Sequence, residues 1–145
     1  MTLANNPLLS GDFRIPFNRI RAEHVEIGIV QALKEAQAEV DQLIAETSQP
    51  TWENTIGRLE VIGVQLSERI APPTHMVSVS ETAELRQAYN AVLPEISAFW
   101  SSLPLNASLW ERVKSYAETE QATQLIGVEK RHLRKTLQDF IRSGA

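Results

Sequence analysis

Apolar residues recur at steps of three and four along most of the chain, the spacing that places side chains on one face of an α-helix. The clearest run begins in residues 50–55, where Thr51 is a good N-cap and Glu53 lies where the helix dipole favours a negative charge. One face of this helix carries Trp52, Ile56, Leu59, Gly63, Leu66 and Ile70. Burying its four branched side chains would contribute on the order of 6–12 kcal/mol, against ~1 kcal/mol for the cap. Packing against other helices therefore decides whether this helix forms.

An earlier helix should cover residues 22–45. Its apolar stripe is Ile29, Leu33, Ala36, Val40 and Leu43. The helix that follows residues 50–55 should end or bend near Ile70. The reason is that Pro72 and Pro73 remove two hydrogen-bond donors and disfavour helical geometry just before them.

The third helix should begin near Ser80 or Thr82. Its stripe is Leu85, Ala88, Val92, Ile96, Phe99 and Leu103. Pro94 falls inside this stripe and removes the hydrogen bond to Asn90, which costs ~3 kcal/mol. Because the stripe continues past Pro94, we expect one kinked helix rather than two helices.

Two shorter helices should complete the chain. Asn106 or Ser108 can cap the fourth, and a polar patch at residues 118–124 separates it from the fifth. The fourth carries Leu109, Trp110, Val113 and Tyr116, and the fifth carries Leu125, Val128, Leu133, Leu137, Phe140 and Ile141. Ser143 and Gly144 supply the final stop.

Residues 1–21 contain turn formers and no helical period, which favours an extended arm laid on the helices. A short strand is the alternative, because Phe13, Ile15 and Phe17 alternate with polar or turn residues. The predicted fold is all-α: an antiparallel bundle of about five helices, one of them kinked, with the extended arm at its N-terminus. The helical domain should cover residues 22–145.

Composition narrows the possible functions. At 145 residues the chain fits one domain. Its net charge of −4 argues against a general nucleic-acid or anionic-membrane surface. The absence of cysteine excludes disulfides and thiolate metal sites. With neither a signal peptide nor an apolar run of membrane-spanning length in the sequence, we expect a cytoplasmic protein.

The three histidines are the first candidates for chemistry. His24 begins a His-x-Glu pattern of the zinc-deaminase type, but the cysteine ligands of that signature are absent, so a histidine in the first turn of a helix is favoured. His75 follows the double proline, and a hydrogen-bonded turn residue is favoured over a ligand. Glu129 and His132 match half of a di-iron motif, which needs a second copy and two more glutamates.

No other catalytic pattern is present. The sequence has no Gly-x-Ser-x-Gly elbow and no glycine-rich phosphate loop. The last helix has a basic side, formed by Lys130, Arg131, Arg134, Lys135 and Arg142. Glu129 and Asp139 interrupt it and the whole chain is acidic, so a solvated face is favoured over an RNA site. The residues alone therefore yield no catalytic residue, no metal ligand and no identified substrate-binding residue.

Six short stretches nonetheless form an ordered series along nearly the whole chain. They are NPLL at residues 6–9, IRAEHV at 20–25, PTWENT at 50–55, THMVSV at 74–79, ELRQAY at 84–89 and LQDF at 137–140. This series resembles the amino-terminal region of the thimet oligopeptidase and oligopeptidase A family of zinc metallopeptidases. The resemblance implies that Trp52 anchors the core and that Leu85 and Tyr89 are packing positions. The pair Pro72 and Pro73, preceded by alanine, departs from the family pattern.

What the resemblance implies is a much longer, all-helical parent enzyme that cleaves short peptides inside a deep channel. In the family a His-Glu-x-x-His helix and a further glutamate hold the zinc, and that motif is absent from residues 1–145. No catalytic or metal position therefore carries over. This region would form one wall of the channel, with the remainder of the peptidase as its partner, and would be inactive alone.

The alternative is a free-standing helical module that binds peptides or a protein partner. Such a module should be polar over its whole outer surface, whereas a domain of a larger enzyme should expose apolar residues where the rest of the enzyme packs. The candidates for that exposed set are Val61, Val64, Phe99, Trp100 and Trp110.

Overall fold

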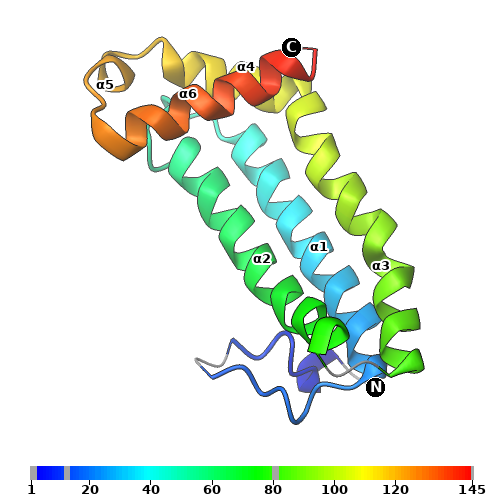
Figure 1. Cartoon of the computed structure of the whole chain (residues 1–145). Helices are drawn as coiled ribbons and strands as arrows, with labels where there is room; N and C mark the ends of the chain where they lie inside the picture. Colours follow the sequence, from blue (N-terminus) through cyan, green and yellow to red (C-terminus); the bar gives the residue numbers. More distant parts are fainter. Residues whose placement is uncertain (1–2, 12–13, 80–81, 145) are drawn as a thin grey trace. The chain divides into compact units, whose positions relative to one another are not determined.

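The computed structural model describes residues 3–11, 14–79 and 82–144, and this described part contains helices and no strand. The elements are η1 (Leu3–Asn5), α1 (Ala22–Ala45), α2 (Ile56–Val79), α3 (Ala83–Ser102), η2 (Leu103–Leu105), α4 (Ala107–Ala117), α5 (Glu120–Thr123) and α6 (Gly127–Arg142) (Figure 1). The predicted all-α class is confirmed, and α1 has the predicted bounds. The strand considered for residues 13–17 involves Phe13, which lies outside the described residues.

Contacts between residues divide the chain into two compact units. Unit 1 consists of residues 1–37 and 63–98, and unit 2 consists of residues 38–62 and 99–145. Each of the three long helices contributes one segment to each unit. The sequence-based boundary between residues 21 and 22 remains a prediction.

In unit 1, antiparallel segments of α1, α2 and α3 enclose a core of branched side chains (Figure 1). Its buried members from the helices are Val25, Ile29, Ala32, Leu33, Ala36, Leu66, Leu85, Val92 and Ile96. The Thr74 hydroxyl bonds the Tyr89 hydroxyl at 2.9 Å and so links α2 to α3. The predicted stripes of α1 and α3 therefore face the core.

The N-terminal arm packs on α1 through Asn6, which is only 2% exposed. Its Nδ2 donates to the carbonyl oxygen of His24 at 2.8 Å, and its Oδ1 accepts from the backbone N–H of Leu8 at 3.0 Å. Gly28 makes this approach possible, because a Cβ there would lie 2.9 Å from Asn6 Nδ2 and 3.0 Å from Leu8 Cδ1. Leu8 and Ile20 are buried, so the predicted extended arm is laid on the helices.

The sequence predicted that the second helix ends or bends near Ile70. The predicted end is wrong, because α2 continues through Pro72 and Pro73 to Val79, and the bend remains a prediction. Both proline rings are buried, and this packing offsets the two lost backbone hydrogen bonds. Because prolines at positions 72 and 73 have no N–H, the carbonyls of residues 68 and 69 lose their helical donors. Both of these residues are accessible to solvent. Thr74 adds a hydroxyl bond to the carbonyl of Ile70 at 2.9 Å.

The helix α3 also runs unbroken through its proline, from Ala83 to Ser102, as predicted for Pro94. Thr82 caps it, since its Oγ1 accepts the backbone N–H of Leu85 at 3.2 Å. The other proposed start, Ser80, lies outside the described residues. The kink at Pro94 remains a prediction.

Unit 2 combines the ends of α1 and α3 and the start of α2 with η2 and the three shorter helices. Asn106 caps α4, because its Oδ1 accepts from the backbone N–H of Leu109 at 2.9 Å. The polar patch after α4 contains one helix that the sequence analysis missed, α5, capped by Thr119. A single buried apolar residue, Ala122, is too little to create a visible period.

The stripe predicted for the last helix is partly wrong. Leu133 and Phe140 are buried, but Val128 is 72% and Ile141 58% exposed. At about 100° per residue, Val128 lies ~140° from Leu133 around the helix, and Ile141 lies ~100° from Phe140. In α2, Ile62 is buried in place of the half-buried Leu59.

One arginine joins the connection between α1 and α2 to α4. The Nη1 atom of Arg112 donates to the carbonyl oxygens of Glu46 and Ser48 at 3.0 and 2.8 Å, and its Nη2 donates to Asn54 Oδ1 at 3.0 Å. The same Asn54 Oδ1 accepts the backbone N–H of Thr51 at 2.8 Å, while Thr51 Oγ1 accepts that of Asn54 at 3.2 Å. Thr51 is therefore a cap, as predicted, but it caps a turn at residues 52–55 that precedes α2.

Replacing Arg112 with methionine should lower the free energy of unfolding by about 1–3 kcal/mol, because two half-buried acceptors and one exposed acceptor lose a charged donor while the aliphatic packing is retained. Urea denaturation measures this change. The matched control is Arg58→Met, since Arg58 makes a single exposed bond to Gln42. That control should cost under about 1 kcal/mol. Equal effects of the two substitutions would show that Arg112 does not organise this connection.

Gly28→Ala should lower the free energy of unfolding by about 1–2 kcal/mol, because the added Cβ would clash with Asn6 and Leu8 of the N-terminal arm. In a solvent-exposed helix the same substitution would instead stabilise by ~1 kcal/mol. The measurement is a double-mutant cycle with Asn6→Ala in urea. Removing the Asn6 amide removes two of the three closest atoms, so Gly28→Ala should cost less in that background. A gain in stability from Gly28→Ala alone would mean that the arm does not pack there.

Candidate functional site

His24 serves as a helix cap. It lies in the first turn of α1, where its Nδ1 accepts the backbone N–H of Arg21 at 2.8 Å, and its own N–H donates to the carbonyl of Arg21 at 2.9 Å. The bond to Nδ1 is one half of a capping box, with histidine at the third helical position, while the second bond is an ordinary backbone bond of the first turn. The predicted first-turn histidine is confirmed.

The other two histidines contact aromatic rings. His75 lies within α2, so the prediction of a turn residue is wrong; its ring centroid is 5.9 Å from that of Phe17. His132 of α6 meets the indole of Trp52 edge-on, with ring centroids 6.1 Å apart. Trp52 also packs against Tyr116, with ring centroids 6.3 Å apart, and its role as a core anchor, which the family resemblance implied, remains a prediction.

The described residues contain no group of three or more His, Asp or Glu side chains that could hold a metal ion. The zinc that the resemblance implies for the parent enzyme therefore does not fit this part of the chain. None of the described helices is both long enough and apolar enough to cross a bilayer.

Tyr116 is buried beside Trp52, and its hydroxyl has no hydrogen-bond partner among the described residues. Burial raises the pKa of Tyr116, and the negative charges of Glu53 and Glu129 raise it further. The phenol is therefore held neutral, and no acceptor among the described residues takes its proton in a hydrogen bond. This arrangement supports packing rather than proton transfer.

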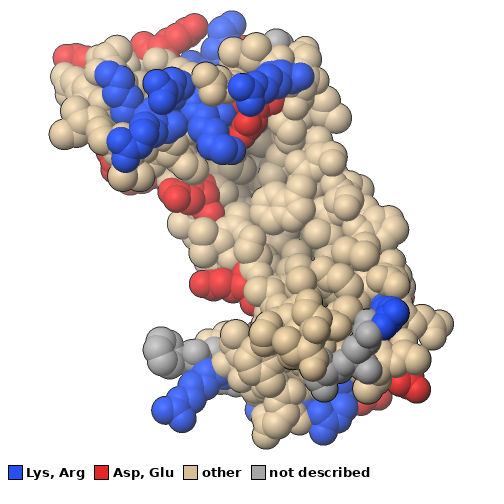
Figure 2. Space-filling model, viewed as in Figure 1, with Lys and Arg blue, Asp and Glu red and all other residues tan. Residues whose placement is uncertain are grey.

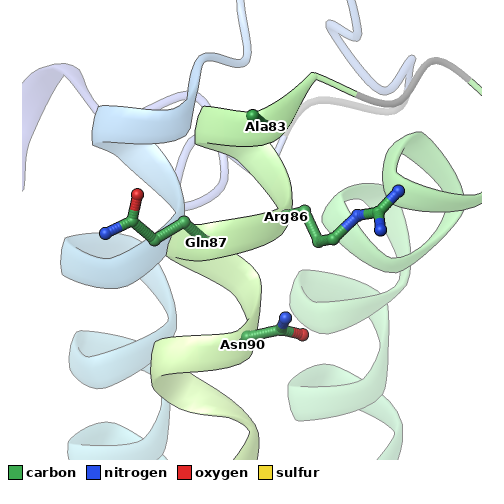
Figure 3. Close-up of a pocket in the computed structure, with 4 residues that line it drawn as sticks. All are labelled: Ala83, Arg86, Gln87 and Asn90. Carbon is green, nitrogen blue, oxygen red and sulfur yellow. The ribbon is translucent and has the colours of Figure 1, made fainter.

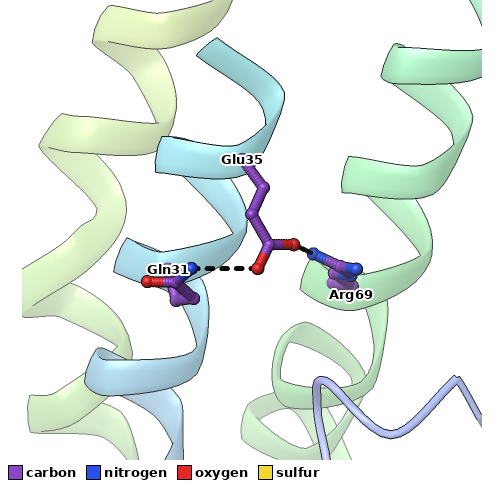
Figure 4. A network of polar contacts seen from close by, with 3 residues as sticks. All are labelled: Gln31, Glu35 and Arg69. Carbon is purple, nitrogen blue, oxygen red and sulfur yellow. Dashed lines mark hydrogen bonds and ion pairs between the residues drawn. The ribbon is translucent and has the colours of Figure 1, made fainter. Parts of the chain in front are cut away.

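A polar network crosses from α1 to α2 in unit 1 (Figure 4). Arg69 donates to one carboxylate oxygen of Glu35, and Gln31 Nε2 donates to the other at 2.9 Å. The pKa of Glu35 lies below its usual value, first because of the bond from Arg69 and then because of the bond from Gln31, with burial opposing both. The carboxylate is occupied by its two donors, so the network is structural.

Arg69 also borders a cavity of about 640 Å³ between the N-terminal arm and α2. From the arm, Pro7, Leu8 and Ile20 line it, and from α2, Glu68 and Pro72. The Ser10 hydroxyl on its wall bonds the carbonyl of Pro7 at 3.1 Å. The described residues that line it include no histidine, cysteine or lysine.

A second hollow, of about 560 Å³, lies along one side of α3. The four side chains drawn in Figure 3, Ala83, Arg86, Gln87 and Asn90, follow one another at helical spacing. Three of them are polar and none is acidic. The hollow contains no group that could act as a base or a nucleophile.

Unit 2 contains a groove of about 490 Å³ along α6, which we call the α6 groove. It is lined by twelve residues: Leu59, Glu60, Trp100, Leu103, Pro104, His132, Lys135, Thr136, Asp139, Phe140, Arg142 and Ser143. Lysine and arginine side chains gather over α6 beside it (Figure 2). The groove thus combines apolar and aromatic surface with charges of both signs, which is typical of ligand sites.

The sequence analysis found these features separately. It singled out Lys135 and Arg142 as part of a basic side and Trp100 as an exposed aromatic, but it did not place them together. It missed Glu60 entirely. Glu60 gave only a weak signal in the sequence, because it is a single carboxylate next to Leu59, in a helix whose apolar stripe was interpreted as a packing face.

Comparison with known proteins identifies the family. The profile described as "Neurolysin/Thimet oligopeptidase, N-terminal domain" matches residues 29–145. Oligopeptidase A of Escherichia coli (strain K12) is 29% identical over 139 residues, which are 96% of this chain and 20% of that protein. The probable cytosolic oligopeptidase A of Arabidopsis thaliana is 30% identical over 143 residues, covering 99% of this chain and 20% of the relative.

A more distant similarity is to the dipeptidyl carboxypeptidase of Salmonella typhimurium, at 24% identity over 147 residues. The chain spans about a fifth of the length of the relatives it matches. Because the family profile covers most of its residues, the chain belongs to the family of neurolysin and thimet oligopeptidase N-terminal domains.

Proposed function

We propose that the chain is the N-terminal helical domain of an oligopeptidase A-like zinc metalloendopeptidase that hydrolyses short peptides. Its role there is to shape the substrate channel, and it is not catalytic by itself. The observation that carries this proposal is the extent of the similarity, which covers 96% of this chain but only 20% of the Escherichia coli oligopeptidase A. The remainder of such a peptidase is then its partner.

Two properties of the chain support a non-catalytic role. The sequence has no His-Glu-x-x-His, the motif in which two histidines on one helical face bind zinc and a glutamate activates water. The histidines that are present cap a helix or contact aromatic rings. Chemistry on a peptide bond would therefore come from the rest of the enzyme.

Exposed apolar side chains favour a domain of a larger enzyme over a free-standing binding module. Val61 and Val64 are each 50% exposed, and Trp100 is 37% exposed. Phe99 is buried, and Trp110 is half-buried against Phe140, so these two leave the predicted exposed set. The cytoplasmic location remains a prediction, because the relatives carry both cytosolic and organellar names.

The purified chain should not cleave a quenched fluorescent nonapeptide, with or without added zinc, because it lacks a ligand set for the metal. The comparison is Escherichia coli oligopeptidase A under the same conditions. Zinc-dependent cleavage that co-purifies with the chain and is abolished by a chelator would overturn the non-catalytic part of the proposal.

The channel role can be tested in a chimera in which this chain replaces the matching region of Escherichia coli oligopeptidase A. We expect the chimera to cleave short peptides and to leave an unfolded protein largely intact, because a narrow wall admits only short chains. Zinc content and thermal melting report whether the chimera is assembled. An assembled chimera that degrades the unfolded protein as fast as the peptides would contradict the channel role.

A further inference from the structure

We propose that unit 2 binds one ordered water molecule between α4 and the turn at residues 48–54. The proposal rests on two buried polar atoms, Nε of Arg112 and the hydroxyl oxygen of Tyr116, which are without a hydrogen-bond partner in the part of the chain that the structure describes. Buried polar atoms of folded proteins are normally satisfied, either by the protein itself or by ordered water. The inference concerns the core of unit 2 and does not depend on the proposed function.

The two unsatisfied atoms belong to the same part of unit 2. Arg112 and Tyr116 are one helical turn apart on α4, at i and i+4, so their side chains leave the same face of the helix. Both side chains also reach the turn that precedes α2. The guanidinium binds Ser48 and Asn54, and the phenol ring packs against Trp52. One small molecule held between α4 and this turn would therefore serve both atoms.

The packing of the two side chains prevents either atom from turning toward a protein acceptor. Both terminal nitrogens of Arg112 already bind the connection between α1 and α2, which fixes the plane of the guanidinium and the direction of its Nε–H. The Tyr116 side chain is fully buried against Trp52, so rotation about the bond to the hydroxyl moves only its proton. Left unsatisfied, each of these groups would lower the folding equilibrium constant roughly 5- to 150-fold.

Water fits the chemistry of this region better than an ion does. The Nε–H of Arg112 only donates, whereas the Tyr116 hydroxyl both donates and accepts, so the ligand must accept one bond and take part in another. Burial has the largest effect in raising the pKa of Tyr116, and the charges of Glu53 and Glu129 raise it further; this negative field opposes an anion. The positive charge of Arg112 opposes a cation. A buried water is neutral and typically makes about three hydrogen bonds, as donor and as acceptor.

A bound water reverses the contribution that the Tyr116 hydroxyl makes to stability. A buried hydroxyl without a partner destabilises the folded state, so its removal in Tyr116→Phe would stabilise the chain. A hydroxyl that bonds a water in the same place stabilises the folded state, and its removal leaves that water with one partner fewer. The sign of the effect of Tyr116→Phe therefore distinguishes the two arrangements.

The test compares Tyr116→Phe with the unchanged 145-residue chain in two measurements. In urea denaturation, the equilibrium constant of unfolding should be about 3- to 10-fold higher for the variant, because a hydrogen bond to the water is lost. Magnetic relaxation dispersion of the water oxygen nuclei counts the waters that stay bound for longer than the protein takes to tumble. That count should fall by one in Tyr116→Phe. Arg112→Met should lose the same water, because methionine has no N–H in its side chain.

The matched control is Tyr89→Phe, the same change at the other tyrosine of the chain, whose hydroxyl accepts that of Thr74 at 2.9 Å. It should leave the number of long-lived waters unchanged. Greater stability of Tyr116→Phe would mean that the hydroxyl has no partner, and it would overturn the proposal. An unchanged number of long-lived waters in Tyr116→Phe would also overturn it, since the hydroxyl would then bond a protein group. So would an anomalous bromide peak beside Arg112 Nε in crystals grown with bromide, which would identify an anion.

Discussion

The guanidinium of Arg112 is the interaction on which the organisation of unit 2 depends. It binds the carbonyls of Glu46 and Ser48, which end α1 and begin the connection, and the side chain of Asn54, which precedes α2. Asn54 in turn closes the capping pair with Thr51. The end of one helix, the start of the next and the position of α4 are therefore determined together. Removing the charge would leave several acceptors unsatisfied at once.

This interaction also shows where prediction from sequence ends. The bounds of α1, the caps of α3 and α4 and the buried stripes follow from local spacing and side-chain chemistry, so they could be predicted. Arg112 and Asn54 are 58 residues apart, and no local pattern pairs them. An arginine among the apolar positions of α4 was the only signal. The predicted end of α2 near Ile70 was wrong for a similar reason, because the burial of Pro72 depends on tertiary packing that the local sequence does not show.

The candidate site was predictable only in parts. A helical wheel shows that Lys135 and Arg142 share a side of α6, but it does not show which neighbouring element that side meets. In the structure, Trp100 from α3 and Glu60 from α2 lie beside this side of α6. The basic side of the last helix, which the sequence analysis interpreted as a solvated face, therefore forms one wall of a groove. Family resemblance added the identity of the domain and no site residue, because the catalytic motif is absent from these residues.

On the proposed function the chain supplies no catalytic group, so it would affect the reaction only through binding. Contacts between a peptide and this domain would then be equally strong in the ground state and in the transition state, because no reacting atom lies in the domain. Uniform binding of this kind lowers KM and leaves kcat unchanged. The domain would therefore select among peptides by their size while the rate of bond cleavage is determined elsewhere.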